Sequence, residues 1–318
     1  MYFLPNRLRG YFISLGNRRI AVSEILIQDI MRLFKGIERT FARWRQERLQ
    51  GRIMREYGQS VMVEKFKGWK PQGEESTIGK DSNIWVCWWQ GEENMPQVVQ
   101  VCYRQLKKMC CGHPVVLITD ENCKDYVNIP DFIWEKYRKG IISRTHFSDI
   151  LRFCLLKEHG GIWIDITNFV TREIDSFVPV EKSFYSCRHI TKYNNVSRGL
   201  WTSYFNASGK GNVVPTYLYE SLVNYWSVTD KLCDYLVLDF IFKLGYDNVP
   251  AIRAAVDSLE VEEIGTMRRI MNRKWNQEEW DRYYAQAGFQ KLSYKKYTNM
   301  TTKKGEKTHY AYLVENFQ

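Results

Sequence analysis

Long apolar runs are missing from this sequence of 318 residues. No stretch approaches the roughly 18 consecutive apolar residues of a membrane-spanning helix, and the N-terminal region lacks the continuous apolar core of a secretory signal peptide. Internal repeats and low-complexity tracts are also lacking, which excludes solenoid and fibrous architectures. We therefore expect a cytoplasmic protein, or one that lies peripherally on the inner face of the cell membrane.

No Cys-x-x-Cys pair occurs among the eight cysteines, and several of them lie in apolar periodic segments. This favours buried, reduced thiols over a disulfide framework. Cys110, Cys111 and His113 are close in the sequence, but there is no second cluster of ligands to complete a zinc site with them.

The net charge of +10 is unevenly distributed, because residues 1–60 contain twelve basic and five acidic residues. Residues 20–57 have the pattern of a basic amphipathic helix. Its apolar positions at helical spacing are Ile30, Leu33, Phe34, Ile37, Phe41 and Trp44. Such a helix can lie on an anionic membrane surface or pack as a cap with a solvated basic face. The Gly- and Pro-rich residues 67–82 resemble a linker, which predicts an arm over 1–81 and a catalytic domain over 82–318.

Strand and helix patterns alternate after the linker. Three short apolar runs predict strands at Ile84–Trp89, Pro114–Ile118 and Ile162–Ile164. Helical spacing predicts helices at Gln97–Met109 and Ser143–His159. This order indicates an α/β domain of the Rossmann-like type, with a parallel sheet that binds nucleotides at the carboxyl ends of its strands.

The C-terminal half is predicted to add further strands and helices. The expected strands are Phe184–Ser186, Leu200–Phe205, Phe289–Tyr294 and His309–Val314. The expected helices are Thr216–Trp226, Tyr235–Leu244 and Glu278–Ala285.

The most informative segment is residues 143–167, SRTHFSDILRFCLLKEHGGIWIDIT. Asp149 and Arg152 share one face of the predicted helix, where they could also form a simple surface ion pair. Gly160-Gly161 end the helix, and the next strand delivers Asp165 at its carboxyl end. Because ligands bind at that edge of such sheets, we expect Asp165 to meet a ligand rather than to pack.

The run SDILR…GGIWID resembles glycosyltransferase family 32 and its relatives, and residues 82–318 are more closely similar to the capsular polysaccharide synthesis proteins. The resemblance implies a nucleotide-diphospho-sugar transferase fold of the GT-A type. It also implies a UDP- or GDP-sugar donor, a divalent Mn²⁺ or Mg²⁺ ion and transfer with retention. The acceptor would be a saccharide of a bacterial surface polysaccharide, either free or attached to a lipid. Nucleic acid is not expected as a partner.

The resemblance also assigns roles to individual residues. Asp149 and Arg152 match residues that hold the donor sugar's hydroxyls and the diphosphate side. Asp165 matches the first Asp of the DXD motif, which contacts the ribose and the metal. Trp89 aligns with a Trp near the nucleotide base, and Trp88 is the alternative.

The sequence departs from the family pattern at Thr167, where the second Asp of the DXD motif is expected. A threonine supplies only a neutral hydroxyl, so the metal, if held by Asp165 and Thr167, is bound more weakly or with the help of another carboxylate.

Several other residues are candidates for the site. Lys291, Lys295 and Lys296 could cover the diphosphate or be solvated lysines beside a strand. Asp234 and Asp239 are five positions apart, so at most one of them faces the site. His146, beside the start of the predicted helix, could contact a ligand, cap the helix or pack.

A function of another class remains open at this point. In it the chain is a non-catalytic module that binds nucleic acid or an acidic polymer through its basic arm, and Thr167 marks a degraded DXD site.

Overall fold

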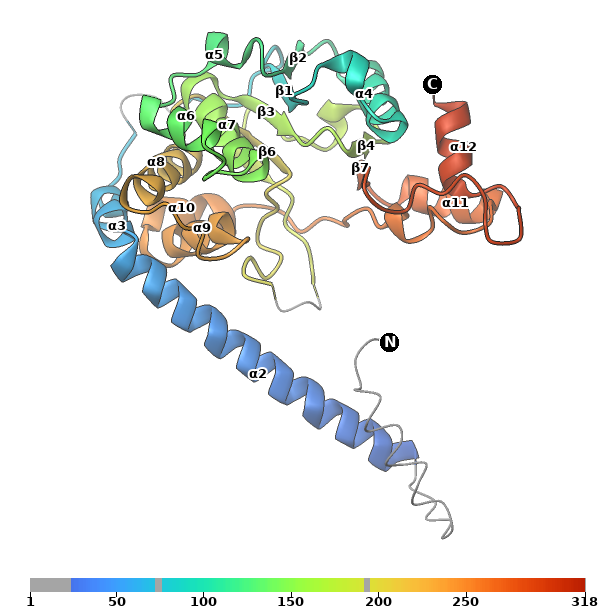
Figure 1. Ribbon diagram of the computed structural model, residues 1–318, viewed down its shortest axis with the longest axis horizontal. Helices are drawn as coiled ribbons and strands as arrows, with labels where there is room; N and C mark the ends of the chain where they lie inside the picture. The colour runs from blue at the N-terminus through green and yellow to red at the C-terminus, as the bar shows by residue number, and fades with distance from the viewer. Residues whose placement is uncertain (1–23, 72–75, 192–194, 318) are drawn as a thin grey trace. The chain divides into compact units, whose positions relative to one another are not determined.

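The computed structural model describes residues 24–71, 76–191 and 195–317. The contacts divide the chain into two compact units, residues 1–47 and 48–318. Figure 1 shows the helices and strands of both units. The strands are β1 (Ile84–Cys87), β2 (Val115–Ile118), β3 (Gly161–Ile164), β4 (Asn168–Val170), β5 (Phe184–Ser186), β6 (Phe205–Ser208) and β7 (Phe289–Lys291). The longer helices are α2 (Glu24–Glu56), α3 (Gln59–Lys67), α4 (Gln97–Met109), α6 (Asp131–Arg138), α7 (Arg144–His159), α8 (Val213–Val228), α9 (Val237–Asn248), α10 (Pro250–Asp257), α11 (Gln277–Ala285) and α12 (His309–Asn316), and α5 (Cys123–Tyr126) is a single turn.

The central sheet has the strand order β2-β1-β3-β6-β5. Strands β2, β1 and β3 run parallel, whereas β6 is antiparallel to β3 and to β5. A second sheet pairs β4 with β7 in antiparallel fashion. The α/β fold class is therefore confirmed, and the arrangement agrees with the GT-A type that the sequence predicts.

Alternate residues of the central strands enter two different cores. Trp85 of β1 and Trp163 of β3 pack against α7 and α8. Their neighbours in the sequence, Val86 and Ile162 among them, pack on the opposite face with α4 and α12. Side chains of a strand alternate between the two faces of a sheet, so strands covered on both faces must be apolar throughout. This explains the short continuous apolar runs of the sequence.

Helix α3 joins the core of the second unit. Met62, Val63 and Phe66 are buried in the same cluster as residues of α8, and Ile53 at the end of α2 is buried with them. The sequence places the domain boundary after residue 81, whereas the compact units divide after Glu47. The apolar face of α3, which the sequence analysis did not identify, accounts for this difference.

Three predicted strands differ from the structure. The strand predicted at 200–205 is β6 at 205–208, and the one predicted at 289–294 ends at Lys291. The strand predicted at His309–Val314 is wrong, because these residues form helix α12. The Thr308 side chain accepts a hydrogen bond from the Ala311 backbone N–H and caps that helix.

The first unit contains the N-terminal part of α2. Ile37, Phe41 and Trp44 of the predicted apolar stripe are exposed, by 56%, 63% and 51%. The rings of Phe41 and Trp44 lie 5.7 Å apart. The predicted stripe residues Ile30, Leu33 and Phe34 precede the residues whose side chains are described.

Candidate active site

A glycine pair aims β3 at the carboxyl edge of the sheet. Gly160 ends α7, and its backbone N–H donates to the Leu156 carbonyl as predicted. Both glycines have positive φ, +70° and +100°, which disfavours a side chain. A Cβ on Gly161 would also lie 2.5 Å from the Asn83 carbonyl oxygen. Strand β3 then ends at Ile164, and Asp165 follows directly.

Helix α7 supplies two charged side chains to the same place. Arg152 is buried, with 6% of its side chain exposed, and its Nη1 donates to Asp149 Oδ1 at 3.0 Å. Its Nη2 donates to Asp165 Oδ1, also at 3.0 Å. The guanidinium lies 5.1 Å over the ring of Trp163, which donates from Nε1 to the same Asp165 oxygen. Asp149 and Arg152 therefore form part of one buried ion cluster rather than an isolated surface pair.

A distant segment completes the cluster. Strands β4 and β7 pair Asn168 with Lys291, which brings this lysine close to the end of β3. Lys291 Nζ donates to Asp165 Oδ2 at 2.7 Å, and its side chain is 22% exposed. Thus both oxygens of Asp165 accept hydrogen bonds from cations.

The two carboxyl groups have opposite electrostatic environments. Burial raises the pKa of Asp149 to about 7, although Arg152 opposes this and the charges of Asp165 and Asp239 add to it. Burial also acts to raise the pKa of Asp165, but Lys291 and Arg152 outweigh it and hold that pKa below its usual value. Asp165 is therefore the permanent anion of the cluster, and Asp149 is a carboxyl that changes its charge near neutral pH.

A cavity of about 250 Å³ opens beside Asp165 at the carboxyl ends of β1 and β3. It is lined by Asp149, Arg152, Asp165 and Thr167 and by aromatic side chains. Both Trp88 and Trp89 border it, but Trp89 is 8% exposed and donates from its Nε1 to Ser148. Trp88 is less buried and its ring meets Tyr294 edge to face at 5.3 Å.

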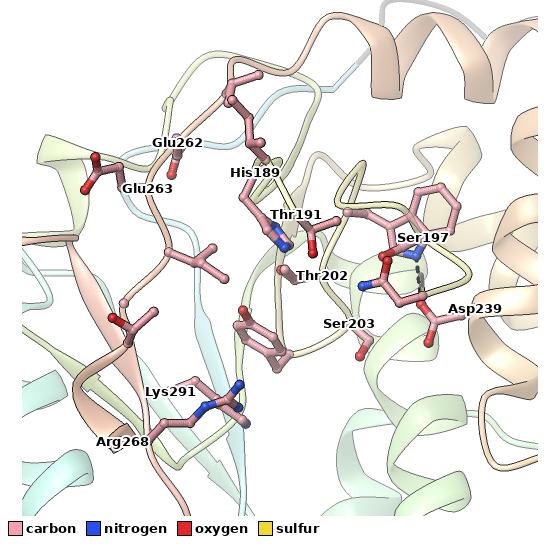
Figure 2. A pocket seen from close by; sticks show the side chains of 18 of the residues that line it. His189, Thr191, Ser197, Thr202, Ser203, Asp239, Glu262, Glu263, Arg268 and Lys291 are labelled. Atoms are coloured by element: carbon pink, nitrogen blue, oxygen red, sulfur yellow. Dashed lines mark hydrogen bonds between the residues drawn. The ribbon is translucent and has the colours of Figure 1, made fainter. Parts of the chain in front are cut away.

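A larger cavity of about 760 Å³ adjoins the cluster on another side (Figure 2). In this view Lys291 and Arg268 lie at one end of the cavity and Asp239 at the other. Asp239 accepts a hydrogen bond from Trp201 Nε1 at 2.9 Å, and burial raises its pKa. The polar side chains of Ser203, Thr202 and Glu262 face the same space.

Comparison with known proteins assigns the chain to a family. A family model described as capsular polysaccharide synthesis protein matches residues 30–313, which is most of the sequence. The chain belongs to this family. No curated protein sequence matches the chain. Among solved structures, one described as PaToxG glycosyltransferase shows 16% identity over 70% of this chain and 83% of its own, with a TM-score of 0.41. A score that low carries no argument about this capsular polysaccharide synthesis protein.

Some predicted site residues of this capsular polysaccharide synthesis protein lie elsewhere. Lys295 and Lys296 are exposed, and neither lines the two cavities. Asp234 accepts a hydrogen bond from the Leu236 N–H at the start of α9, so only Asp239 of that pair faces a cavity, as the spacing predicts. His146 is buried and lines neither cavity; its ring forms a hydrogen bond with Ser143 Oγ at 2.8 Å, and Ser143 is the residue that caps α7.

Of the eight cysteines, Cys87 at the end of β1 lines the smaller cavity, where burial raises the pKa of its thiol, and the other seven line neither cavity. All eight cysteines are free of disulfide bonds. His113, which follows Cys110 and Cys111, forms hydrogen bonds with Ser82 O and Asp175 Oδ1. Sequence reasoning missed Trp163 and Tyr294. The two-residue spacing between Trp163 and Asp165 could have revealed the first, because such residues share one face of a strand.

The divalent metal that the resemblance implies has no ready set of ligands in this arrangement. Within the described ranges no group of three or more His, Cys, Asp or Glu side chains could hold a metal ion. Both oxygens of Asp165 are engaged by Arg152 and Lys291. Thr167 borders the smaller cavity but offers a neutral hydroxyl. The donor set present does not fit a metal, which prefers several charged oxygens.

Proposed function

We propose that this member of the capsular polysaccharide synthesis family is a glycosyltransferase. It transfers a sugar, with retention, from a nucleotide-diphosphate sugar to a saccharide acceptor of a surface polysaccharide. The observation that carries the proposal is the position of the ion cluster. The cluster lies between two cavities at the carboxyl edge of the parallel strands, where such sheets bind nucleotides.

The smaller cavity suits the nucleotide end of the donor. Trp88 is the better partner for the base than Trp89, because Trp89 is buried against Phe147 and Tyr137. An aromatic face and the edge of Tyr294 offer the stacking surface that a base needs. Asp165, at the end of β3, lies where it can accept hydrogen bonds from the ribose hydroxyls.

The ion cluster suits the sugar and the diphosphate. Asp149 can accept hydrogen bonds from sugar hydroxyls, and Arg152 holds that carboxylate in place. A diphosphate needs positive charge as its bridging bond breaks, and the exposed part of Lys291 supplies it.

The larger cavity suits the acceptor. Its volume of about 760 Å³ is sufficient for a saccharide, and its lining includes hydroxyl and carboxyl groups besides the cations Lys291 and Arg268. Asp239 lies at the end of this cavity opposite Lys291, and its charge contributes to raising the pKa of Asp149. We assign Asp239 the role of orienting the acceptor hydroxyl.

The proposed reaction exchanges one bond of the sugar for another. The bond from the sugar's anomeric carbon to the diphosphate breaks, and its electron pair leaves on the phosphate oxygen. The acceptor oxygen bonds to the same face of that carbon, and its proton passes to the leaving phosphate oxygen. Lys291 stabilises the charge on that oxygen, and this electrostatic interaction lowers the barrier of the reaction.

We propose that the N-terminal arm makes a peripheral contact with the membrane. Among the described helices none is long and apolar enough to cross a membrane. The exposed Phe41 and Trp44 lie among arginines of α2, a composition that binds anionic lipid surfaces. Such contact would bring the enzyme to a lipid-linked acceptor.

The proposal is tested by incubating the full chain with a panel of UDP- and GDP-sugars and measuring release of nucleoside diphosphate. A transferase releases it slowly to water with its own donor even without an acceptor. The rival function, a non-catalytic anion-binding module, predicts no release from any donor and binding of polyanions that falls steeply with salt.

A further inference from the structure

The Asp165 carboxylate has cations on both sides. Its Oδ1 accepts from Arg152 and Trp163, and its Oδ2 accepts from Lys291 at 2.7 Å. We propose, on the basis of the function proposed above, that this enzyme binds the donor diphosphate without a divalent metal. The Lys291 ammonium, fixed by Asp165, takes the place of the metal.

The cluster holds as many cations as carboxyl groups, and because the pKa of Asp149 is raised to about 7, the net charge of the cluster near neutral pH is zero or positive without any added ion. Asp149 and Asp165 contribute two carboxyl groups, and Arg152 and Lys291 contribute two cations. A divalent ion on Asp165 would lie against the Lys291 ammonium, and like charges repel strongly where water is scarce. Lysine therefore competes with a metal for the same carboxylate oxygen.

The second Asp of the DXD motif, which would help to hold a metal, is replaced by Thr167. Thr167 follows Asp165 by two positions and is 9% exposed, and its side chain forms no hydrogen bond within the described part of the chain. The backbone carbonyl of Thr167 accepts from the Leu292 N–H at 2.9 Å, which fixes this turn beside β7. The same contact holds the adjacent Lys291 in place.

Lys291 retains donors for a phosphate. An ammonium group has three N–H donors, and Asp165 uses one of them. The amino group lies 5.1 Å over the ring of Tyr204 and borders the larger cavity. Arg268 borders that cavity too and makes no ion pair with any residue in the described ranges. Two cations thus face the space where a diphosphate would lie between the two cavities.

The test is nucleotide affinity with and without metal, measured on the full chain. UDP and GDP are titrated by calorimetry, once with millimolar MnCl₂ and once with EDTA, and the Kd is determined in each buffer. We expect the better of the two nucleotides to bind with affinities that agree within about twofold in both buffers, because the cations are part of the protein.

Lys291→Met removes the ammonium and keeps the length of the side chain. It should weaken nucleotide binding in EDTA by about tenfold or more, the usual loss for a charge-assisted hydrogen bond. Lys296→Met is the matched control, because Lys296 is exposed and lines neither cavity. It should bind as the wild type does. Circular dichroism shows whether each variant is folded.

A third variant asks whether a metal site can be created. In Lys291→Met combined with Thr167→Asp, both changes favour a cation on Asp165, so electron paramagnetic resonance should detect bound Mn²⁺. The wild type should bind no Mn²⁺ in the same titration, with or without nucleotide.

The outcomes separate this inference from the proposed function. If wild-type binding of UDP or GDP requires Mn²⁺, or Lys291→Met binds as tightly as Lys296→Met in EDTA, the inference is overturned and the transferase stands. If neither nucleotide binds in either buffer, the transferase proposal fails and the inference fails with it.

Discussion

Arg152 is the structural centre of the proposed site, and its removal should cost both stability and binding. Its guanidinium donates to Asp149 and Asp165 at 3.0 Å each, and 6% of the side chain is exposed. Breaking a buried ion pair by removing one partner costs about 3–5 kcal/mol, because the other charges remain buried. Arg152→Met should therefore lower the free energy of unfolding by about this amount, which shifts the urea midpoint by at least ~1 M.

The comparison needs an exposed ion pair of similar kind. Lys67 Nζ lies 3.5 Å from Glu64 Oε2, and both side chains are more than half exposed. Lys67→Met should change the stability by no more than about 0.5 kcal/mol. Arg152→Lys keeps the charge but loses the fork that reaches two carboxylates, so its stability should lie between those of the wild type and Arg152→Met.

The assay is urea unfolding followed by tryptophan fluorescence, together with calorimetry of nucleotide binding on the folded variants. Without urea, where Arg152→Met is still folded, it should bind nucleotide more weakly than the wild type does. Equal urea midpoints for Arg152→Met and Lys67→Met would refute the reasoning, because the ion cluster would then contribute no more than a surface pair.

Three other outcomes follow from the structure. The pKa of Asp149 is raised to about 7, so the wild type loses stability as the pH rises from the usual carboxyl range towards 7 and this carboxyl ionises. Asp149→Asn cannot ionise and should therefore gain stability relative to the wild type between pH 5 and 7. Equal differences in urea midpoint at every pH would contradict this. Trp88→Ala should weaken nucleotide binding by about tenfold with little change in stability, as for loss of a stacked base, whereas Trp89→Ala should mainly lower the urea midpoint, and the reverse pattern would return the base to Trp89. Deleting residues 1–47 should leave donor hydrolysis intact and abolish salt-sensitive binding to vesicles that contain phosphatidylserine; unchanged vesicle binding would rule out the arm as the membrane contact.

The deletion ends at residue 47 for a structural reason. Ile53, Met62 and Phe66 are buried in the core of the second unit, so a longer deletion would remove core side chains. A matched control replaces Phe41 and Trp44 by Ser in the full chain, because both are exposed and the charge of the arm is kept. Its vesicle binding should fall although its net charge is unchanged.

Local patterns were sufficient to predict much of the fold. Helix α4 begins and ends where the sequence predicts, because its apolar positions follow a single stripe. Helix α7, the glycine pair and β3 were also correct, since a helix stripe, a glycine pair and a short apolar run are all local signals. The strand predicted at His309–Val314 was wrong, because the apolar residues of this short segment also fit a helical face once Thr308 caps it.

The site was only partly accessible to sequence reasoning. The motif gave Asp149, Arg152 and Asp165, and the structure joins them in one cluster. The contact of Lys291 with Asp165 depends on the pairing of β4 with β7, between residues far apart in the sequence. The choice between Trp88 and Trp89 depends on which ring the neighbouring helices cover, and no local pattern contains that information.

The central claim, sugar transfer at the Asp165 centre, is tested most directly by one measurement on two proteins. Release of nucleoside diphosphate from the UDP- and GDP-sugar panel is compared for the wild type and Asp165→Asn, which changes the charge and keeps the size. We predict that the wild type hydrolyses at least one donor and that the folded variant is slower by about a hundredfold, as for loss of a key electrostatic contact. Hydrolysis of no donor by the wild type, or equal rates for the two proteins, would contradict the account.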